Sequence, residues 1–190
     1  MSKPSREAGR KADLINAAIR RVAQAGSHDV TVAEIAREAG MSPALAHHYF
    51  GSKEQMLLMA MRHILREYGA AVRAALVGAD GPHARIEAIF AVSFGPVHFD
   101  REVIAAWFGF YALAQTNPDA ARLLRVYQRR LRANLAADLR KLTDDAPVVA
   151  DALAALIDGL YIRAALGDAA PQGQAAQAVL SETLARMIAR

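Results

Sequence analysis

The chain has 190 residues, of which 54% are apolar and only 6% aromatic, and its formal net charge is +4. This length suffices for one large core or for a small module joined to a larger one, and the lack of alternating Val, Ile, Thr and Tyr runs argues against a sheet protein and predicts an all-α fold. The lack of cysteine excludes disulfides and thiolate metal sites, while a polar N-terminus and a longest apolar run of 12 residues (103–114) predict a soluble, cytoplasmic protein without signal peptide or membrane span.

A first helix is expected over residues 10–25, after a polar arm at residues 1–9. Its apolar residues between Leu14 and Val22 are spaced so that they share one face, which turns to the core. Gly26 is expected to end this helix, because glycine is common just past a helix C-terminus.

Positive charge is concentrated in the N-terminal third of the chain. Residues 1–66 hold 10 Lys or Arg against 6 Asp or Glu, whereas residues 67–190 hold 13 of each. A phosphate-binding surface requires such an excess, although a solvated basic face would have the same composition.

The next segment predicts two short helices joined by a tight turn. Thr31 and Glu34 have the spacing of a capping box, in which the hydroxyl and the carboxylate each accept a backbone N–H at the start of the helix. Gly40 permits the left-handed backbone that ends a helix. Ser42 is expected to cap the second helix and Pro43 to occupy its first position, where a missing N–H costs nothing.

Two helices of this kind form a helix-turn-helix, whose second helix enters the major groove of DNA with its N-terminal residues over the base edges. That second helix, expected over residues 43–49, carries two histidines, a tyrosine and small side chains that can meet DNA. Sequence-specific DNA binding is therefore the leading hypothesis.

The rest of the chain predicts further helices separated by Gly and Pro breaks, nine or ten in all, with no internal repeat. The fourth helix begins at Ser52, which has capping-box spacing with Gln55, and would link the basic module to the remainder. The expected ranges are 52–76, 83–94, 100–115, 119–141, 148–166 and 174–188. The last two would either pair with their symmetry mates in a four-helix dimer interface or complete the core of a monomer.

Four of the 12 aromatic residues fall within five positions: Trp107, Phe108, Phe110 and Tyr111. On a helix Trp107, Phe110 and Tyr111 share one face. Such a face can line a pocket for a quaternary ammonium, whose charge is attracted to each ring by about 0.5–2 kcal/mol. An aromatic stripe at helical spacing equally suits an ordinary core.

Asp158 lies within an otherwise apolar helix, with Tyr161 on the same face. A buried carboxylate is costly unless it is paired, and a bound cation would pair it. Arg163, Tyr161 or a partner subunit could do the same.

Other chemistries find little support in the chain. His47 and His48 are adjacent and therefore point about 100° apart on a helix, so they cannot share a metal ion. The other histidines lack ligand spacing, and there is no nucleophile–base pair and no glycine-rich phosphate loop. We therefore expect no metal, no cofactor and no enzyme. An architectural DNA-binding protein would have no use for the long uncharged body.

The first helix, the capped TVAEIAREAGMS and the aromatic-rich YFGSKEQML resemble the DNA-binding domain of the TetR family of repressors over about residues 10–58. This resemblance implies a homodimer of all-α subunits that binds a double-stranded DNA operator. Each subunit would have a helix-turn-helix domain at residues 1–55 and a larger ligand-binding and dimerisation domain at residues 56–190.

A departure from the family pattern narrows the resemblance. Most members have tyrosine at the position of His47 and histidine at that of Tyr49, whereas this chain has AHHYF. The segments AAWFGFYA (105–112) and AALIDGLYIRAAL (154–166) resemble one branch, the choline-responsive repressors of glycine betaine synthesis, which also has the HYF variant.

The resemblance implies which residues contact DNA. Pro43, Ala44 and Leu45 would meet base edges, mostly through apolar contacts such as the thymine methyl group, unless they only pack or face water. His47 and Tyr49 would donate to phosphates, and Lys53 would add its charge to the exposed N–H groups of the fourth helix, as Thr31 would add its own N–H. The full set is Thr31, Ser42, Pro43, Ala44, Leu45, His47, His48, Tyr49 and Lys53.

The branch also implies a ligand. The repressor would leave a palindromic operator when choline or betaine aldehyde binds. The residues implied to hold this ligand are Trp107, Phe110, Tyr111, Asp158 and Tyr161. A repressor of the same family that responds to a lipophilic cation or an acyl compound is the alternative.

Overall fold

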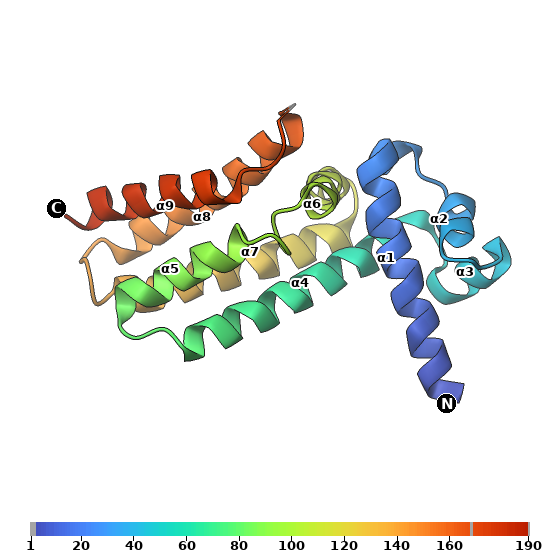
Figure 1. Cartoon of the computed structure of the whole chain (residues 1–190), viewed down its shortest axis with the longest axis horizontal. Coiled ribbons are helices and arrows are strands. Elements are labelled where there is room, and N and C mark those ends of the chain that lie inside the picture. Colours follow the sequence, from blue (N-terminus) through green and yellow to red (C-terminus); the bar gives the residue numbers. More distant parts are fainter. Residues whose placement is uncertain (1–2, 168, 190) are drawn as a thin grey trace.

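The computed structural model describes residues 3–167 and 169–189, and within these ranges the chain forms nine helices and no strand (Figure 1). The all-α prediction is therefore confirmed. The helices are α1 (Lys3–Asp29), α2 (Val32–Glu38), α3 (Pro43–Phe50), α4 (Lys53–Val77), α5 (Pro82–Ser93), α6 (Arg101–Ala114), α7 (Pro118–Leu139), α8 (Ala146–Leu166) and α9 (Gly173–Ile188). Among the described residues, no helix is both long and apolar enough to cross a membrane.

Eight of the nine helices begin and end within two residues of their expected positions, but α1 does not. It starts at Lys3 instead of Arg10 and continues past Gly26 to Asp29, so the expected arm and the expected stop are both wrong; residues 1–2 of that arm lie outside the described residues. A glycine inside a helix costs only about 1 kcal/mol, which the packing of α1 on its neighbours offsets.

The helices divide the molecule into a small end and a long body (Figure 1). α1, α2 and α3 lie together at one end, and α4 leaves them to run along one edge of the body, while α8 and α9 lie along the opposite edge in this view. α1 packs mainly on α6 and on the first turns of α4, and α7 packs between α5, α6 and α8. The position of α6 is thus linked to that of α1.

An ion pair fastens the far end of α4 to the body. Arg85 on α5 donates from Nε to both carboxylate oxygens of Asp138 on α7 at 3.0 Å, and from Nη1 to the Leu76 carbonyl at the end of α4 at 2.9 Å. Asp138 is 3% exposed while the Arg85 side chain is still partly exposed, and the charge-assisted hydrogen bonds join α4, α5 and α7 at this point.

Candidate DNA-binding surface and ligand site

The start of α2 has the capping box that the sequence predicts. The Thr31 hydroxyl oxygen accepts the Glu34 backbone N–H at 3.3 Å, and the Glu34 carboxylate accepts the Thr31 N–H at 2.8 Å. The Thr31 hydroxyl also donates to Glu34 Oε2 at 2.8 Å, and the two donors, first the Thr31 N–H and then this hydroxyl, lower the pKa of the Glu34 carboxyl because they stabilise its charged form. Thr31 is therefore engaged in holding α2, whether or not it also meets DNA.

A tight left-handed turn joins α2 to α3. Gly40 has φ 68°, and the N–H of Met41 donates to the Ala36 carbonyl at 2.8 Å, which ends α2 in a left-handed turn. Ser42 then accepts the Leu45 N–H at 3.3 Å and caps α3. The prediction of two capped helices across a tight turn is confirmed.

One face of α3 is outward. Its inner face places Ala46 and Phe50 in the core, at 0% and 2% exposure. Six of the nine predicted DNA contacts are exposed: Thr31, Ser42, Pro43, Ala44, His47 and His48. Leu45, Tyr49 and Lys53 are half-buried. The exposed face has small apolar groups at the start of α3 and imidazoles nearer its end, so base contact at the start remains the prediction.

His47 is held by the backbone that follows α3. Its Nδ1 lies 2.8 Å from the Gly51 carbonyl oxygen, which can only accept, so Nδ1 carries a proton. In the neutral ring Nε2 then has no proton to give. His47 can donate to a phosphate from Nε2 only as the imidazolium, which limits the role predicted for it.

Lys11 of α1 also lies at this surface, and the sequence did not predict it. The Lys11 ammonium lies 5.6 Å from the centroid of the Tyr49 ring and pairs with Glu7 at 2.8 Å. Nothing in the local sequence around Lys11 indicates that α1 passes beside α3, because this approach depends on tertiary packing.

Lys53 is the first residue of α4 and provides a direct test of phosphate contact. We expect Lys53→Ala to weaken binding to specific and non-specific duplexes by the same factor and to reduce the salt-dependence slope by about one. Lys141→Ala, a change of the same charge on the body, should leave both unchanged. Fluorescence anisotropy over a salt series measures this, and an unequal loss on the two duplexes would show that Lys53 does not act through phosphate.

The predicted ligand residues of α6 and α8 come together around Trp107, which is 5% exposed. Its ring centroid lies 5.6 Å from that of Tyr111 and 6.0 Å from that of Tyr161. The nearest ring belongs to Tyr127 of α7, at 4.6 Å, which the sequence did not single out. Tyr127 is one isolated aromatic on a long basic helix, so no local spacing indicates its role.

Asp158 faces this aromatic cluster. Its Oδ1 accepts the Tyr111 hydroxyl at 3.0 Å and the Tyr127 hydroxyl at 3.3 Å. Burial raises the pKa of the Asp158 carboxyl, opposed by hydrogen bonds from the two tyrosines and Gln128. The pKa values of both tyrosines are raised as well, chiefly by burial and then by the nearby carboxylate, so their hydroxyls stay protonated and donate.

The alternatives for Asp158 are partly resolved by these contacts. A bond to Tyr161 is wrong, because the Tyr161 hydroxyl donates to the carbonyls of Ser93 at 2.5 Å and His98 at 2.8 Å. Arg163 is exposed, and among the described residues the hydrogen bonds to Asp158 come from Tyr111, Tyr127 and Gln128 instead. The carboxylate is thus partnered only by neutral donors, and it keeps its capacity to attract a cation.

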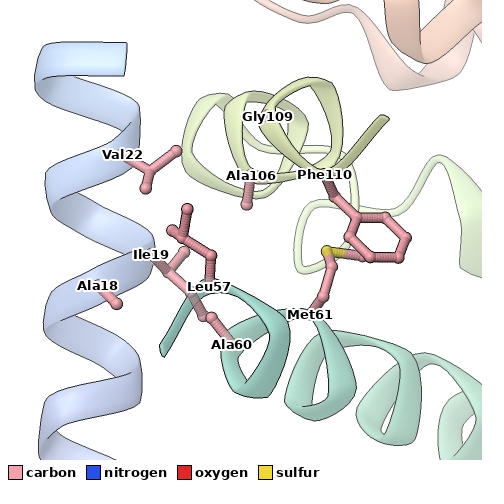
Figure 2. Close-up of a pocket in the computed structure, with 9 residues that line it drawn as sticks. All are labelled: Ala18, Ile19, Val22, Leu57, Ala60, Met61, Ala106, Gly109 and Phe110. Atoms are coloured by element: carbon pink, nitrogen blue, oxygen red, sulfur yellow. The ribbon is translucent and has the colours of Figure 1, made fainter. Parts of the chain in front are cut away.

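Phe110 lies at the edge of the cluster and points elsewhere. Its ring is 6.1 Å from that of Trp107, and it packs beside Met61 of α4 where α1, α4 and α6 meet (Figure 2). The cavity there is about 20 Å³, enough for one water. Phe110 therefore joins the aromatic cluster to the helices that carry the DNA-binding surface, and this position does not favour direct ligand contact.

Comparison with known protein families matches both parts of the chain. Residues 14–60 match the family of bacterial regulatory proteins of the tetR type, and residues 82–189 match the C-terminal domain of BetI-type transcriptional repressors. Among curated relatives, the HTH-type transcriptional regulator BetI of Brucella suis biovar 1 is 51% identical over 187 residues, which cover 97% of this chain and 94% of that protein. The BetI protein of Agrobacterium fabrum is 48% identical over 184 residues, covering 96% and 89% of the two chains.

Solved structures have the same fold. A transcriptional regulator of Pseudomonas aeruginosa PAO1 superposes with a TM-score of 0.82 at 26% identity, over 100% of this chain and 93% of the other. A regulator of Saccharomonospora viridis, solved in complex with choline, superposes with a TM-score of 0.84 at 24% identity, over 94% and 96%.

The relatives above are transcriptional regulators and not enzymes. Their similarity extends over nearly the whole chain, and the family-model matches lie on the helix-turn-helix and on the helical body described above. The chain therefore belongs to the BetI-type branch of the TetR family of DNA-binding transcriptional repressors.

Proposed function

We propose that this repressor binds a palindromic operator as a homodimer and is released from it by a quaternary ammonium, choline or betaine aldehyde. The observation that carries the proposal is the half-buried Asp158 carboxylate, which accepts the hydroxyls of Tyr111 and Tyr127, whose rings lie 5.6 and 4.6 Å from the Trp107 ring. The choline complex of the Saccharomonospora viridis regulator, which shares the fold, supports the same ligand class.

The chemistry of this cluster suits a trimethylammonium group. Such a group has no N–H to donate, so it is attracted by charge and by ring faces, at about 0.5–2 kcal/mol per ring. Asp158 already accepts its hydrogen bonds from tyrosines and can pair with the cation without giving them up. A lipophilic cation would use the same attraction, whereas an uncharged acyl inducer would leave the carboxylate desolvated and unpaired.

Ligand binding would move α6. The Trp107 and Tyr127 rings are in contact, so an ammonium between them requires α6 and α7 to separate. Because α6 packs on α1 and Phe110 packs on α4, this displacement would tilt a DNA-binding domain of residues 1–55 relative to a body of residues 56–190. Binding of the ligand would then weaken binding of the operator, and the reverse, by a coupling free energy of about 1–3 kcal/mol.

The surface of α8 and α9 supports a dimer rather than a monomer core. Val148, Ile162 and Val179 are 65%, 37% and 46% exposed, although their neighbours on the same helices are buried. A hollow of about 470 Å³ between the helices is lined by Leu160 and Val179 among others. Pairing this face with its symmetry mate would bury it. The resulting dimer would place its two DNA-binding domains on the two half-sites of a palindrome. We infer that it does so in the cytoplasm, where the chromosome lies.

The single tryptophan makes choline binding directly measurable. Because Trp107 lies in the proposed site, choline and betaine aldehyde should produce a saturable change in its emission. The matched control is 3,3-dimethylbutan-1-ol, which has the shape of choline without the charge and should bind at least tenfold more weakly. An emission unaffected by choline, or an equal response to the neutral alcohol, would discard the ammonium site.

A further inference from the structure

A larger hollow lies outside the aromatic cluster, in a groove between α4 and α7. Its volume is about 590 Å³, within the range of small-molecule pockets. Four arginines line it, Arg62, Arg66 and Arg73 from α4 and Arg130 from α7, and its lining contains no carboxylate. The groove is therefore strongly electropositive, unlike the site proposed for the ammonium.

The α4 arginines converge on this groove by helix geometry. Residues 62, 66 and 73 are four and seven positions apart, so they lie within about 40° of one another and extend along about 16 Å of α4. The described ion pairs include none of the four groove arginines, although they include Arg85, Arg132 and Arg186 elsewhere on the body. Four unneutralised guanidinium groups around one hollow repel one another, and an anion in the groove would relieve that repulsion.

The walls between the arginines are apolar. Leu65 and Val72 line the α4 side, Leu123 and Val126 line the α7 side, and the Tyr68 and Tyr127 rings also line the groove. Gly69 adds room, since a Cβ at this position would meet only the Arg73 guanidinium, at 3.5 Å. The groove therefore combines positive charge with apolar walls. This combination suits a ligand that has an anionic head and a hydrocarbon chain.

We propose that the α4/α7 groove binds a long-chain carboxylate, a fatty-acid-sized anion, as a second ligand of this repressor. A single planar guanidinium can bind a carboxylate through two parallel hydrogen bonds, and the groove offers such a group on each wall, Arg66 on α4 and Arg130 on α7. The groove is distinct from the proposed ammonium site: its lining includes Tyr127, which also contacts Trp107 and Asp158, but neither Trp107 nor Asp158 lines it. Failure of choline to bind would therefore leave this inference untouched.

The test uses the full chain and the fluorescent probe 11-(dansylamino)undecanoate, whose emission rises in an apolar site. We expect saturable binding that dodecanoate reverses and that dodecan-1-ol, of equal chain length without the charge, reverses at least tenfold less well. Equal competition by the alcohol would overturn the anionic assignment. Dodecyl phosphate competing tenfold better than dodecanoate would overturn the carboxylate and assign a phosphate head instead.

Variants locate the probe in the groove. The pair Arg66→Gln and Arg130→Gln should lower probe affinity at least tenfold, while the matched pair Arg122→Gln and Arg125→Gln, exposed on α7 outside the groove lining, should not change it. Gly69→Leu should abolish binding by filling the groove, and it should not lower the melting temperature because leucine is the better helix former. Equal losses from both arginine pairs, or unchanged binding in Gly69→Leu, would overturn the proposal.

Discussion

Replacing Asp158 with asparagine is expected to weaken choline binding by about 30- to 100-fold and to leave operator affinity unchanged. A carboxylate about 5 Å from a cation in a partly buried site contributes on the order of 2–3 kcal/mol, which the neutral amide removes. The substitution keeps both tyrosine hydrogen bonds, because both go to Oδ1 and the amide oxygen of asparagine can accept both.

The same substitution has a signature in pH. Burial raises the pKa of Asp158. The choline affinity of the unsubstituted protein should therefore fall as pH decreases through that raised value, because the protonated carboxyl no longer attracts the cation. The choline affinity of Asp158→Asn should not change over the same pH range. The raised pKa of Asp158 in the folded state also affects stability. The contribution of Asp158 to the free energy of unfolding is most favourable below its pKa in the unfolded chain, and it is lost as pH rises through its pKa in the folded protein. Asp158→Asn should therefore melt no lower than the original protein at neutral pH.

Calorimetric titration with choline and thermal melting measure these effects. The matched control is Asp151→Asn, an exposed change on the same helix that removes the ion pair with Arg132 and should leave choline affinity as it was. Choline affinity that survives Asp158→Asn, together with a lower melting temperature, would make Asp158 a structural residue.

The second large effect is expected on DNA. Ala44→Glu should weaken operator binding by about two orders of magnitude, because like charges brought together at an interface cost several kcal/mol. The fold should tolerate it: Ala44 is exposed, and a carboxylate in the first turn of a helix stabilises it by about 0.3–1 kcal/mol.

The readouts for Ala44→Glu separate binding from folding. Operator affinity is measured by anisotropy, while choline affinity and melting temperature should match those of the original protein. Ala91→Glu, the same change on an exposed position of α5, serves as the control and should bind operator normally. If Ala44→Glu retained full operator affinity, the start of α3 would not face the bases.

The helix boundaries could be predicted from the sequence wherever a capping residue, a glycine or a proline sets them. Ser42, Ser52 and Asp100 each accept a backbone N–H at a helix start, and such contacts lie within three residues of one another in sequence. The limits of α1 did not follow, because Gly26 lies inside the helix and packing of α1 on α6 outweighs its weak propensity.

The ligand site could be predicted only one helix at a time. Helical spacing placed Trp107 and Tyr111 on one face, and in the structure the Tyr111 ring lies beside Trp107 while its hydroxyl donates to Asp158. Helical spacing could not identify Tyr127, because a contact between α6 and α7 depends on how the two helices cross. The same limit applies to Phe110, whose face of α6 meets α1 and α4 as well as the cluster.

The most direct test of a choline-released repressor is a titration of the purified chain onto DNA upstream of its own gene, followed by fluorescence anisotropy with and without millimolar choline. We predict tight, salt-sensitive binding that choline or betaine aldehyde weakens by about 5- to 150-fold, the range of a 1–3 kcal/mol coupling. Tight binding that neither compound alters would contradict the account and leave a repressor of another inducer.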